Sequence, residues 1–310
     1  MPTLCPSASD PTQSGSPDTS PIWLDHCIIC RDTHFTPLYP RQFEWLQSCT
    51  SCGLTFSQPQ ASDTQLDEIY DEDYYKTFGF DPDSSSRYRV MKQASFGALL
   101  EVAEEHFSPG RLLDVGSALG DLLVAAQDRN WDVHGIEPNL FAVERANELI
   151  QDATTHGTLA QLPAEDEPYD FITCVDVIEH LRRPDETLKH MHQRLKQDGG
   201  VMIVTNDISS LAATLMGPKW VHYHLDHLWY FNRQSLKELV QSSGFEVVAV
   251  KRARKIFNFS YILGILAHSP NHRFLQRIAQ SSLKWIPERL LCMLLPAAPE
   301  GILLLARKKS

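Results

Sequence analysis

Long hydrophobic runs are absent from this 310-residue chain, and basic residues are in short supply. No run reaches the roughly 18 apolar residues that span a bilayer, since the nearest, Ile256–Ala267, is too short. The N-terminus lacks the basic-then-apolar order of a secretory signal, so we expect a cytoplasmic protein. With 28 Lys and Arg against 39 Asp and Glu, the formal charge is −11, which argues against nucleic acid as a partner.

Cysteine is scarce as well, with seven residues in the chain. That number is too small for a disulfide scaffold, and four of the seven form two Cys-x-x-Cys pairs. In a cytosolic protein such pairs indicate a metal site. The remaining composition, 43% hydrophobic and 22% charged, allows the chain to bury a substantial core.

Shifts in composition divide the chain into four parts. Residues 1–21 hold five Pro and five Ser with almost nothing apolar, which predicts a disordered tail. Residues 22–60 carry the cysteine pairs between short β-prone runs and form a small module, and residues 61–108 form an acidic helical cap or linker. We interpret residues 109–310 as one larger domain, in which 251–300 is a basic, apolar insertion before the last strand.

Apolar runs alternate with helical stretches beyond residue 109. The runs lie at Arg111–Val115, Asp132–Ile136, Asp170–Val175, Val201–Thr205 and Phe245–Val250, followed at the end by Gly301–Arg307. The helical stretches lie at Asp121–Asn130, Leu140–Gln151, Pro184–Leu195 and Gln234–Ser243. This alternation predicts an α/β fold with a mostly parallel sheet and helices on both of its faces.

The cysteine pairs have the spacing of a zinc site. Cys27 and Cys30 are separated by 18 residues from Cys49 and Cys52, as is typical of tetrahedral thiolate zinc. Four thiolates close the coordination shell, so such a Zn²⁺ would be structural rather than catalytic. The alternative is four ordinary buried or free cysteines. The loop between the pairs holds only two basic residues, so we interpret the module as a docking or substrate-side element rather than a nucleic-acid binder.

A ligand site is indicated where a strand ends in Asp114 and turns sharply into a helix. Gly116, Ser117 and Gly120 would let a ligand approach the main chain at the start of that helix. Glu137, at the end of the next strand, is placed to accept hydrogen bonds from both hydroxyls of a ribose.

The spacing of the glycines separates two classes of cofactor. A nicotinamide-binding fold, the competing interpretation, needs Gly-x-Gly-x-x-Gly and a helix N-terminus that faces a diphosphate. Here the spacing is Gly-x-x-x-Gly, and Asp114 lies just before it. Negative charge at that point suits a ligand with a sulfonium and an ammonium group, which indicates S-adenosyl-L-methionine.

Over about residues 109–250, and again at 301–308, the chain resembles the class I S-adenosylmethionine-dependent methyltransferases. Six motifs carry the resemblance: Asp-Val-Gly-Ser-Ala-Leu-Gly from Asp114, Gly-Ile-Glu-Pro from Gly135, Asp-Phe-Ile from Asp170, Val-Ile-Glu-His-Leu from Val177, Gly-Gly-Val from Gly199 and Ser-Gly-Phe from Ser243. The N-terminal part resembles the zinc module, followed by Tyr-Asp-x-Asp-Tyr-Tyr, that precedes this domain in bacterial sugar C-methyltransferases. The central domain also resembles the ubiquinone-pathway O-methyltransferases. Ala118 stands where the commoner motif has a glycine.

The resemblance implies a Rossmann-like, seven-stranded methyltransferase sheet with a small N-terminal zinc-binding module. It places Asp114, Gly116 and Gly120 at the methionine end of the cofactor and Glu137 at its ribose. The remaining positions that it implies are Thr158 and Leu159 near the adenine, Val175 and Asp176 facing the reacting centre, and Gly301–Arg307 as an antiparallel seventh strand beside the sixth.

Asp176, Glu179 and His180 form the candidate catalytic group. If the segment after the fourth strand is helical, these positions share one face and could bind a divalent cation such as Mg²⁺, as the Glu-x-x-Glu-His segment of the ubiquinone-pathway enzymes does. Alternatively, His180 is a general base oriented by Glu179, or both residues only brace the next helix. His227 either contacts the substrate or anchors its own loop by hydrogen bonds.

We therefore expect methyl transfer to an oxygen or carbon nucleophile of a small-molecule, sugar or lipid-linked acceptor. A non-enzymatic zinc adaptor on a degenerate methyltransferase fold is the alternative, and a nicotinamide oxidoreductase is a third. The last sixty residues hold eleven Lys and Arg against two Asp and Glu, together with many apolar residues. Basic and apolar residues together predict a peripheral membrane contact through 251–290, and a helical lid on the sheet is the alternative.

Overall fold

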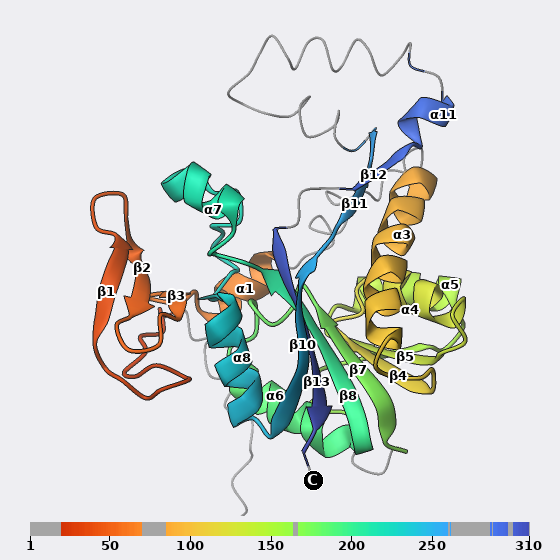
Figure 1. Ribbon diagram of the computed structural model, residues 1–310, viewed down its shortest axis with the longest axis horizontal. Coiled ribbons are helices and arrows are strands. Elements are labelled where there is room, and N and C mark those ends of the chain that lie inside the picture. Colours follow the sequence, from red (N-terminus) through yellow and green to blue (C-terminus); the bar gives the residue numbers. More distant parts are fainter. Residues whose placement is uncertain are drawn as a thin grey trace, which may run out of the picture.

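The computed structural model describes residues 20–69, 85–163, 167–259, 288–296 and 300–309, with residues 261 and 286. Residues 1–19 of the predicted tail, the tyrosines of the acidic linker and most of the predicted insertion lie outside the described residues. The mixed α/β architecture that the sequence predicts is confirmed, with one large sheet and a small N-terminal sheet beside it (Figure 1).

The large sheet has seven strands in the order β10-β13-β8-β7-β4-β5-β6. Their bounds are β4 Arg111–Val115, β5 Asp132–Glu137, β6 Thr154–His156, β7 Tyr169–Val175, β8 Leu195–Asn206, β10 Phe245–Ala253 and β13 Gly301–Lys308. The pairs β4–β5, β4–β7, β5–β6 and β7–β8 are parallel, and β13 lies antiparallel between β8 and β10. This is the arrangement expected of a class I methyltransferase sheet, with its reversed last strand inserted next to the sixth.

Helices cover both faces of this sheet. On one face pack α3 (Ser85–Glu104) and α4 (Asp121–Gln127), and on the other pack α6 (Pro184–Arg194) and α8 (Arg233–Ser242), as Figure 1 shows. The strand β8 illustrates why, because its residues point alternately to the two sides. Met202 and Val204 are buried against α3 and α4, whereas Val201 and Ile203 are buried against α6 and α8. The helix α5 (Leu140–Leu149) follows β5 and carries Asn139 as its N-cap.

The small sheet is formed by β1 (Phe35–Tyr39), β2 (Phe43–Cys49), β3 (Thr55–Ser57) and β9 (Trp229–Tyr230). The first three strands come from the cysteine-bearing module. The strand β9 comes from the larger domain and pairs antiparallel with β3. The backbone N–H of Ser57 also donates a hydrogen bond of 3.1 Å to the carbonyl of Leu228. The module is thus joined to the larger domain through a shared sheet.

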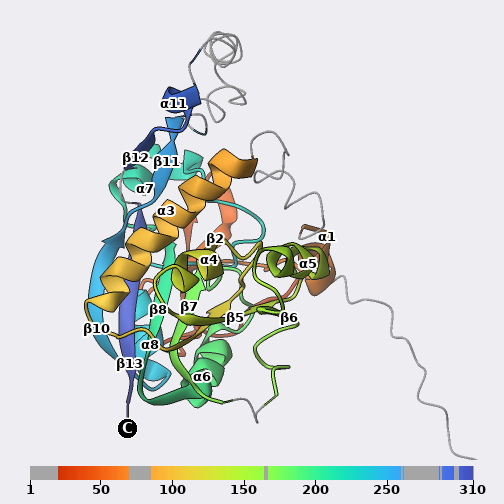
Figure 2. The same cartoon turned by 90° about the vertical axis from the view of Figure 1, so that its right-hand side faces the viewer.

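The remaining elements lie at one end of the molecule or beside the module. They are α1 Asp63–Ile69, α7 Leu211–Met216, a short 3-10 helix at Gly217–Lys219, β11 Ile256–Asn258, α11 Glu288–Leu291 and β12 Leu294–Pro296. Figures 1 and 2 both place α7 and α11 at the end of the molecule where the parallel strands finish. Among the described residues, no helix combines the length and apolar character needed to cross a membrane.

Candidate active site

A cavity of about 1580 Å³ lies at the carboxyl ends of the parallel strands. Ligands of open α/β sheets bind at this edge. All four predicted catalytic residues line the cavity, and so do the predicted cofactor residues apart from Gly120. We call the part lined by Asp114–Ser117, Glu137, Thr158 and Leu159 the glycine side. The part lined by Asp176, Glu179, His180 and His227 is the histidine side.

The turn between β4 and α4 requires left-handed backbone at three positions. Gly116 has φ +74°, and a Cβ there would lie 2.5 Å from Cγ2 of Val177. Gly120, the N-cap of α4, has φ +81°, and a Cβ there would lie 3.0 Å from Ala146. Ala118 has φ +45°, which is strained for an L-residue and explains why glycine is commoner at this position. Its N–H donates to Glu137 Oε2 at 3.0 Å, which helps to hold the strained turn.

Glu137 is buried at the end of β5 and held by the main chain. Oε2 accepts from the N–H of Ala118, and Oε1 accepts from the N–H of Asn139 at 3.0 Å. Both carboxylate oxygens are thus fixed by main-chain N–H groups. The carboxylate is therefore pre-oriented toward the cavity, as a partner for two ribose hydroxyls needs to be.

Two buried carboxyl groups, those of Asp114 and Asp121, line the cavity at the glycine side. Asp114 accepts a hydrogen bond of 2.6 Å from Oγ1 of Thr173, yet burial raises its pKa to about 7. Burial likewise raises the pKa of Asp121 to about 6, although Arg89 lies 3.5 Å away. Both groups would be stabilised in their ionised form by a positively charged ligand. The sequence analysis did not identify Asp121 as a site residue, because an acidic residue in the first turn is a common feature of helix N-termini.

The rest of the glycine side also leaves room for a ligand. Ser117 Oγ is buried and has no hydrogen-bond partner among the described residues. Thr158 follows β6, where both its N–H and its hydroxyl bond to Oε1 of Gln161, and Leu159 beside it is buried. An orphaned hydroxyl, a fixed carboxylate and two buried acids together fit S-adenosyl-L-methionine, with its sulfonium, ammonium and ribose groups.

The histidine side differs from the sequence-based expectation. Residues 176–180 form a bend and a turn rather than a helix, and Asp176 has φ +54°. The expected sharing of one helical face by Asp176, Glu179 and His180 is therefore wrong. Asp176 instead forms an ion pair of 2.9 Å with Lys255, which follows β10. Burial alone would raise the pKa of Asp176, but the Lys255 ammonium holds it below its ordinary value. Lys255 has no local sequence signal, since it lies 79 residues from Asp176.

His227 takes the place beside Glu179 and His180 that Asp176 was expected to fill. One ligand atom from each of these three residues lies within 4.8 Å of the other two. Glu179 is buried with Oε2 lacking a hydrogen-bond partner among the described residues, and burial raises its pKa. The rings of His180 and His227 meet edge to face, with centroids 4.6 Å apart.

Protonation states in this cluster follow from its contacts. His180 Nδ1 lies 3.0 Å from the carbonyl oxygen of Asp226 and must donate to it, because a carbonyl only accepts. Burial, and then the neighbouring histidines His180, His224 and His222, lower the pKa of His227 to about 2, so this ring is neutral. The main chain after His227 is fixed as well, since the N–H groups of Leu228 and Trp229 donate to the carbonyl of Glu179 at 2.8 and 3.2 Å.

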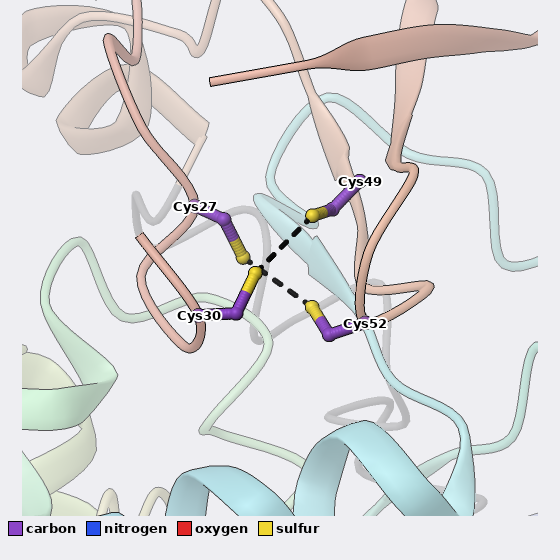
Figure 3. A group of neighbouring side chains, drawn as sticks. All are labelled: Cys27, Cys30, Cys49 and Cys52. Carbon is purple, nitrogen blue, oxygen red and sulfur yellow. Dashed lines mark hydrogen bonds between the residues drawn. The ribbon is translucent and has the colours of Figure 1, made fainter. Parts of the chain in front are cut away.

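The four cysteines of the small module converge on one point, as Figure 3 shows. The sulfur atoms of Cys27 and Cys52 lie 3.5 Å apart, and those of Cys30 and Cys49 lie 3.4 Å apart. Sulfur atoms around a tetrahedral Zn²⁺ with Zn–S bonds of about 2.3 Å lie about 3.8 Å apart. The donor set and its spacing therefore fit a closed tetrahedral site, and the left-handed Gly53 (φ +71°) follows the second pair.

Comparisons with known proteins agree with this geometry. The family model "Methyltransferase domain" matches residues 85–250. The chain is 25% identical over 134 residues to an uncharacterized methyltransferase of Staphylococcus carnosus, covering 43% of this chain and 59% of that protein. It is 26% identical over 149 residues to the mitochondrial ubiquinone biosynthesis O-methyltransferase of Schizosaccharomyces pombe, covering 44% and 53%. The matched regions thus span little more than half the length of these relatives.

Solved structures share the fold. A Pyrococcus horikoshii protein superposes with a TM-score of 0.51 at 14% identity, covering 77% of this chain and 100% of that one. A Bacillus halodurans protein, described as a candidate methyltransferase, gives 0.51 at 17% identity, covering 70% and 100%. The family match spans more than half of the chain and includes the glycine turn, Glu137 and the histidine cluster. The chain therefore belongs to the methyltransferase-domain family and has the fold of the class I S-adenosylmethionine-dependent enzymes.

Proposed function

We propose that this protein transfers a methyl group from S-adenosyl-L-methionine to a hydroxyl group of a small-molecule, sugar or lipid-linked acceptor. The observation that carries the proposal is the orientation of His180 at the cavity wall. Its Nδ1–H is used by the carbonyl of Asp226, so Nε2 is the nitrogen that can take a proton. The similarity to a ubiquinone biosynthesis O-methyltransferase supports an oxygen nucleophile.

The residues of the glycine side would hold the cofactor. Asp114 and Asp121 would neutralise the ammonium and sulfonium charges, and Glu137 would accept from the ribose hydroxyls. When bound, S-adenosyl-L-methionine supplies an electrophilic methyl group on sulfur. The walls of the cavity hold donor and acceptor in line, and such positioning contributes most of the rate enhancement.

His180 would act on the acceptor. Its Nε2 takes the hydroxyl proton as the new O–CH₃ bond forms and the S–CH₃ bond breaks, with the bonding pair returning to sulfur. The products are the methyl ether and S-adenosylhomocysteine. The Asp226 carboxylate, 3.5 Å from Nδ1, stabilises the imidazolium that results.

A metal-assisted version of this function is favoured by the unpartnered Oε2 of Glu179. Glu179, His180 and His227 could hold a cation that polarises the acceptor hydroxyl. Two imidazoles with one carboxylate suit Zn²⁺ or Fe²⁺ better than the Mg²⁺ expected from the sequence. If a chelator abolishes turnover while the cysteine-bound metal is retained, the metal-assisted mechanism is supported. If the chelator has no effect on turnover, the mechanism with His180 as a metal-free base is supported.

We also propose that Cys27, Cys30, Cys49 and Cys52 bind one structural Zn²⁺. The distances and the closed thiolate set support it. Elemental analysis of purified protein would give about one zinc per chain. Metal-free protein with an oxidised Cys27–Cys30 pair would contradict the proposal.

The function is tested with methyl-labelled S-adenosylmethionine and three acceptor classes: a catechol, a nucleotide sugar and a lipid-linked glycan. We expect a labelled methyl ether together with stoichiometric S-adenosylhomocysteine. A product that carries the labelled methyl group on carbon would show that the nucleophile is carbon and not oxygen. Calorimetry that detects no cofactor binding at millimolar concentration would favour the zinc adaptor, which the intact carboxylates of Asp114 and Glu137 argue against.

A further inference from the structure

Exposed leucines gather on α7 and in the loop that follows it. In this helix Ala213 is buried against the small module, whereas Leu211 and Leu215, four positions apart, share the opposite face and are 74% and 76% exposed. Leu225, in the following loop, is 71% exposed. Single exposed leucines are ordinary, but several on one short segment mark an interaction surface.

A second group of exposed apolar residues lies on α11 and β12. Leu290, Met293 and Leu294 are all exposed to solvent. This group is far from α7 in sequence, yet Figures 1 and 2 show both helices at the end of the molecule where the parallel strands finish. The start of β13 marks that end, because Gly301 pairs with Asn206, the last residue of β8. We call this end, with its two apolar groups, the apolar face.

Exposed basic side chains lie around the apolar face, although the protein as a whole is acidic. Lys219 ends the 3-10 helix that follows α7, Arg289 lies on α11, and Arg254 follows the end of β10 beside Gly301. None of these three forms an ion pair among the described residues, and all are exposed. Of the acidic groups at the same end, Asp176 pairs with Lys255 and Asp207 pairs with Arg233. Apolar side chains beside exposed basic side chains complement an anionic lipid surface.

The cavity lies at the same end of the molecule. Val221, in the loop after α7, and Arg254 both belong to its lining, together with Ile256 and Phe257 of β11. We infer that the apolar face rests on a membrane that contains anionic lipids, with Leu211 and Leu215 inserted among the lipids. An amphiphilic acceptor could then enter the cavity from the membrane surface.

Vesicle co-sedimentation tests this inference without any methyl acceptor, so its outcome is independent of the proposed function. The probes are vesicles of phosphatidylcholine alone and of phosphatidylcholine with phosphatidylglycerol. We expect binding to the anionic vesicles at low salt and at least about fivefold weaker binding to neutral vesicles or at high salt. The double variant Leu211→Ser/Leu215→Ser would bind anionic vesicles at least about tenfold more weakly, because two large apolar side chains are lost.

A matched control separates this face from other exposed apolar residues. Val248→Ser changes an exposed residue of β10 whose neighbour Val247 pairs with Ala306, toward the opposite end of the sheet. It should bind vesicles as the unsubstituted protein does. Unchanged thermal unfolding and S-adenosylhomocysteine affinity would show that the double variant is folded.

Three results would overturn the inference. The first is no binding to anionic vesicles at low salt, and the second is equal binding by the double variant. The third is a dimer, seen by sedimentation velocity, that the leucine substitutions dissociate, because the face would then belong to a second copy of the chain.

Discussion

The two sides of the cavity are built in different ways on the same edge of one sheet. The glycine side comes mainly from two short, continuous segments, the turn after β4 and the end of β5, and its geometry is set by the main chain. The histidine side is assembled from three distant segments, around His180, His227 and Lys255, and its geometry is set by side-chain contacts. A site made by a continuous turn can be read from a motif, whereas one made by distant side chains depends on how the loops fold.

The comparison predicts that substitutions on the two sides separate turnover from cofactor binding. The largest effect is expected for His180→Ala. Loss of the base should lower turnover of the acceptor found in the labelling screen by roughly 10²- to 10⁴-fold. Affinity for S-adenosylhomocysteine, measured by calorimetry, should stay within about twofold of that of the unsubstituted protein, since His180 does not belong to the glycine side. Wild-type turnover at matched stability would remove any catalytic role for His180.

Glu137→Ala should have the opposite signature. Two hydrogen bonds from a carboxylate to the ribose are lost, and hydrogen bonds to charged groups contribute about 1.5–3 kcal/mol each, so affinity should fall by roughly 10²- to 10⁴-fold. The same substitution at Glu186, an exposed residue at the cavity lining, is the matched control and should leave affinity unchanged. Calorimetry with S-adenosylhomocysteine measures both variants, and equal affinities would contradict the assignment of Glu137.

Cys49→Ser tests whether the small module supports only the histidine side. Loss of the metal should disturb β3, which pairs with β9 next to His227. Turnover should fall roughly 10- to 100-fold, because a displacement of about 1 Å at a catalytic group can cost that much. Affinity for S-adenosylhomocysteine and the fold of the large sheet, followed by circular dichroism, should be retained.

Cys292→Ser is the matched control for this variant, because Cys292 is an exposed cysteine outside the cluster. It should keep both zinc content and turnover. If Cys49→Ser loses zinc but keeps full turnover, the small module does not position the histidine side.

The smallest effect concerns the pH dependence of cofactor affinity. Burial raises the pKa of Asp114 to about 7, so without ligand this carboxyl is mostly protonated below that pH. A cationic ligand binds the ionised form, and affinity should therefore rise about tenfold between about pH 6 and pH 8. In Asp114→Asn the affinity should be weaker and this slope largely lost. A slope of the same size in the variant would assign the titration to another group, with Asp121 the first to examine.

Several elements could be predicted from the sequence because their signals are local. The apolar runs of β4 and β7 and the Asp114–Gly120 turn were each identified within a few residues of their observed bounds. The strand β6 gave no such run, because its sequence is Thr-Thr-His and only Thr154 is buried at the sheet edge. The condition that residues 176–180 are helical is not met, because Asp176 takes a left-handed conformation and pairs with Lys255.

The candidate site shows the same division. Asp114, Gly116 and Glu137 could be placed together from one motif, and the structure brings them to one cavity. Glu179 and His180 are adjacent in sequence. His227, the third member of their cluster, is separated from them in the sequence by α6, β8 and α7. A local sequence pattern does not predict which distant residue completes a cluster, because this depends on how the loops pack in the folded protein.

The pairing of β3 with β9 has a consequence for how such a chain can change over evolution. Ser57 and His227 are 170 positions apart, yet Ser57 donates a hydrogen bond to the carbonyl of His227. Trp229 of β9 also donates to the carbonyl of Leu181, next to His180. Deleting the cysteine module alone would leave β9 without its strand partner beside His227. Residues near 57 and near 229 are therefore expected to be inherited as a pair.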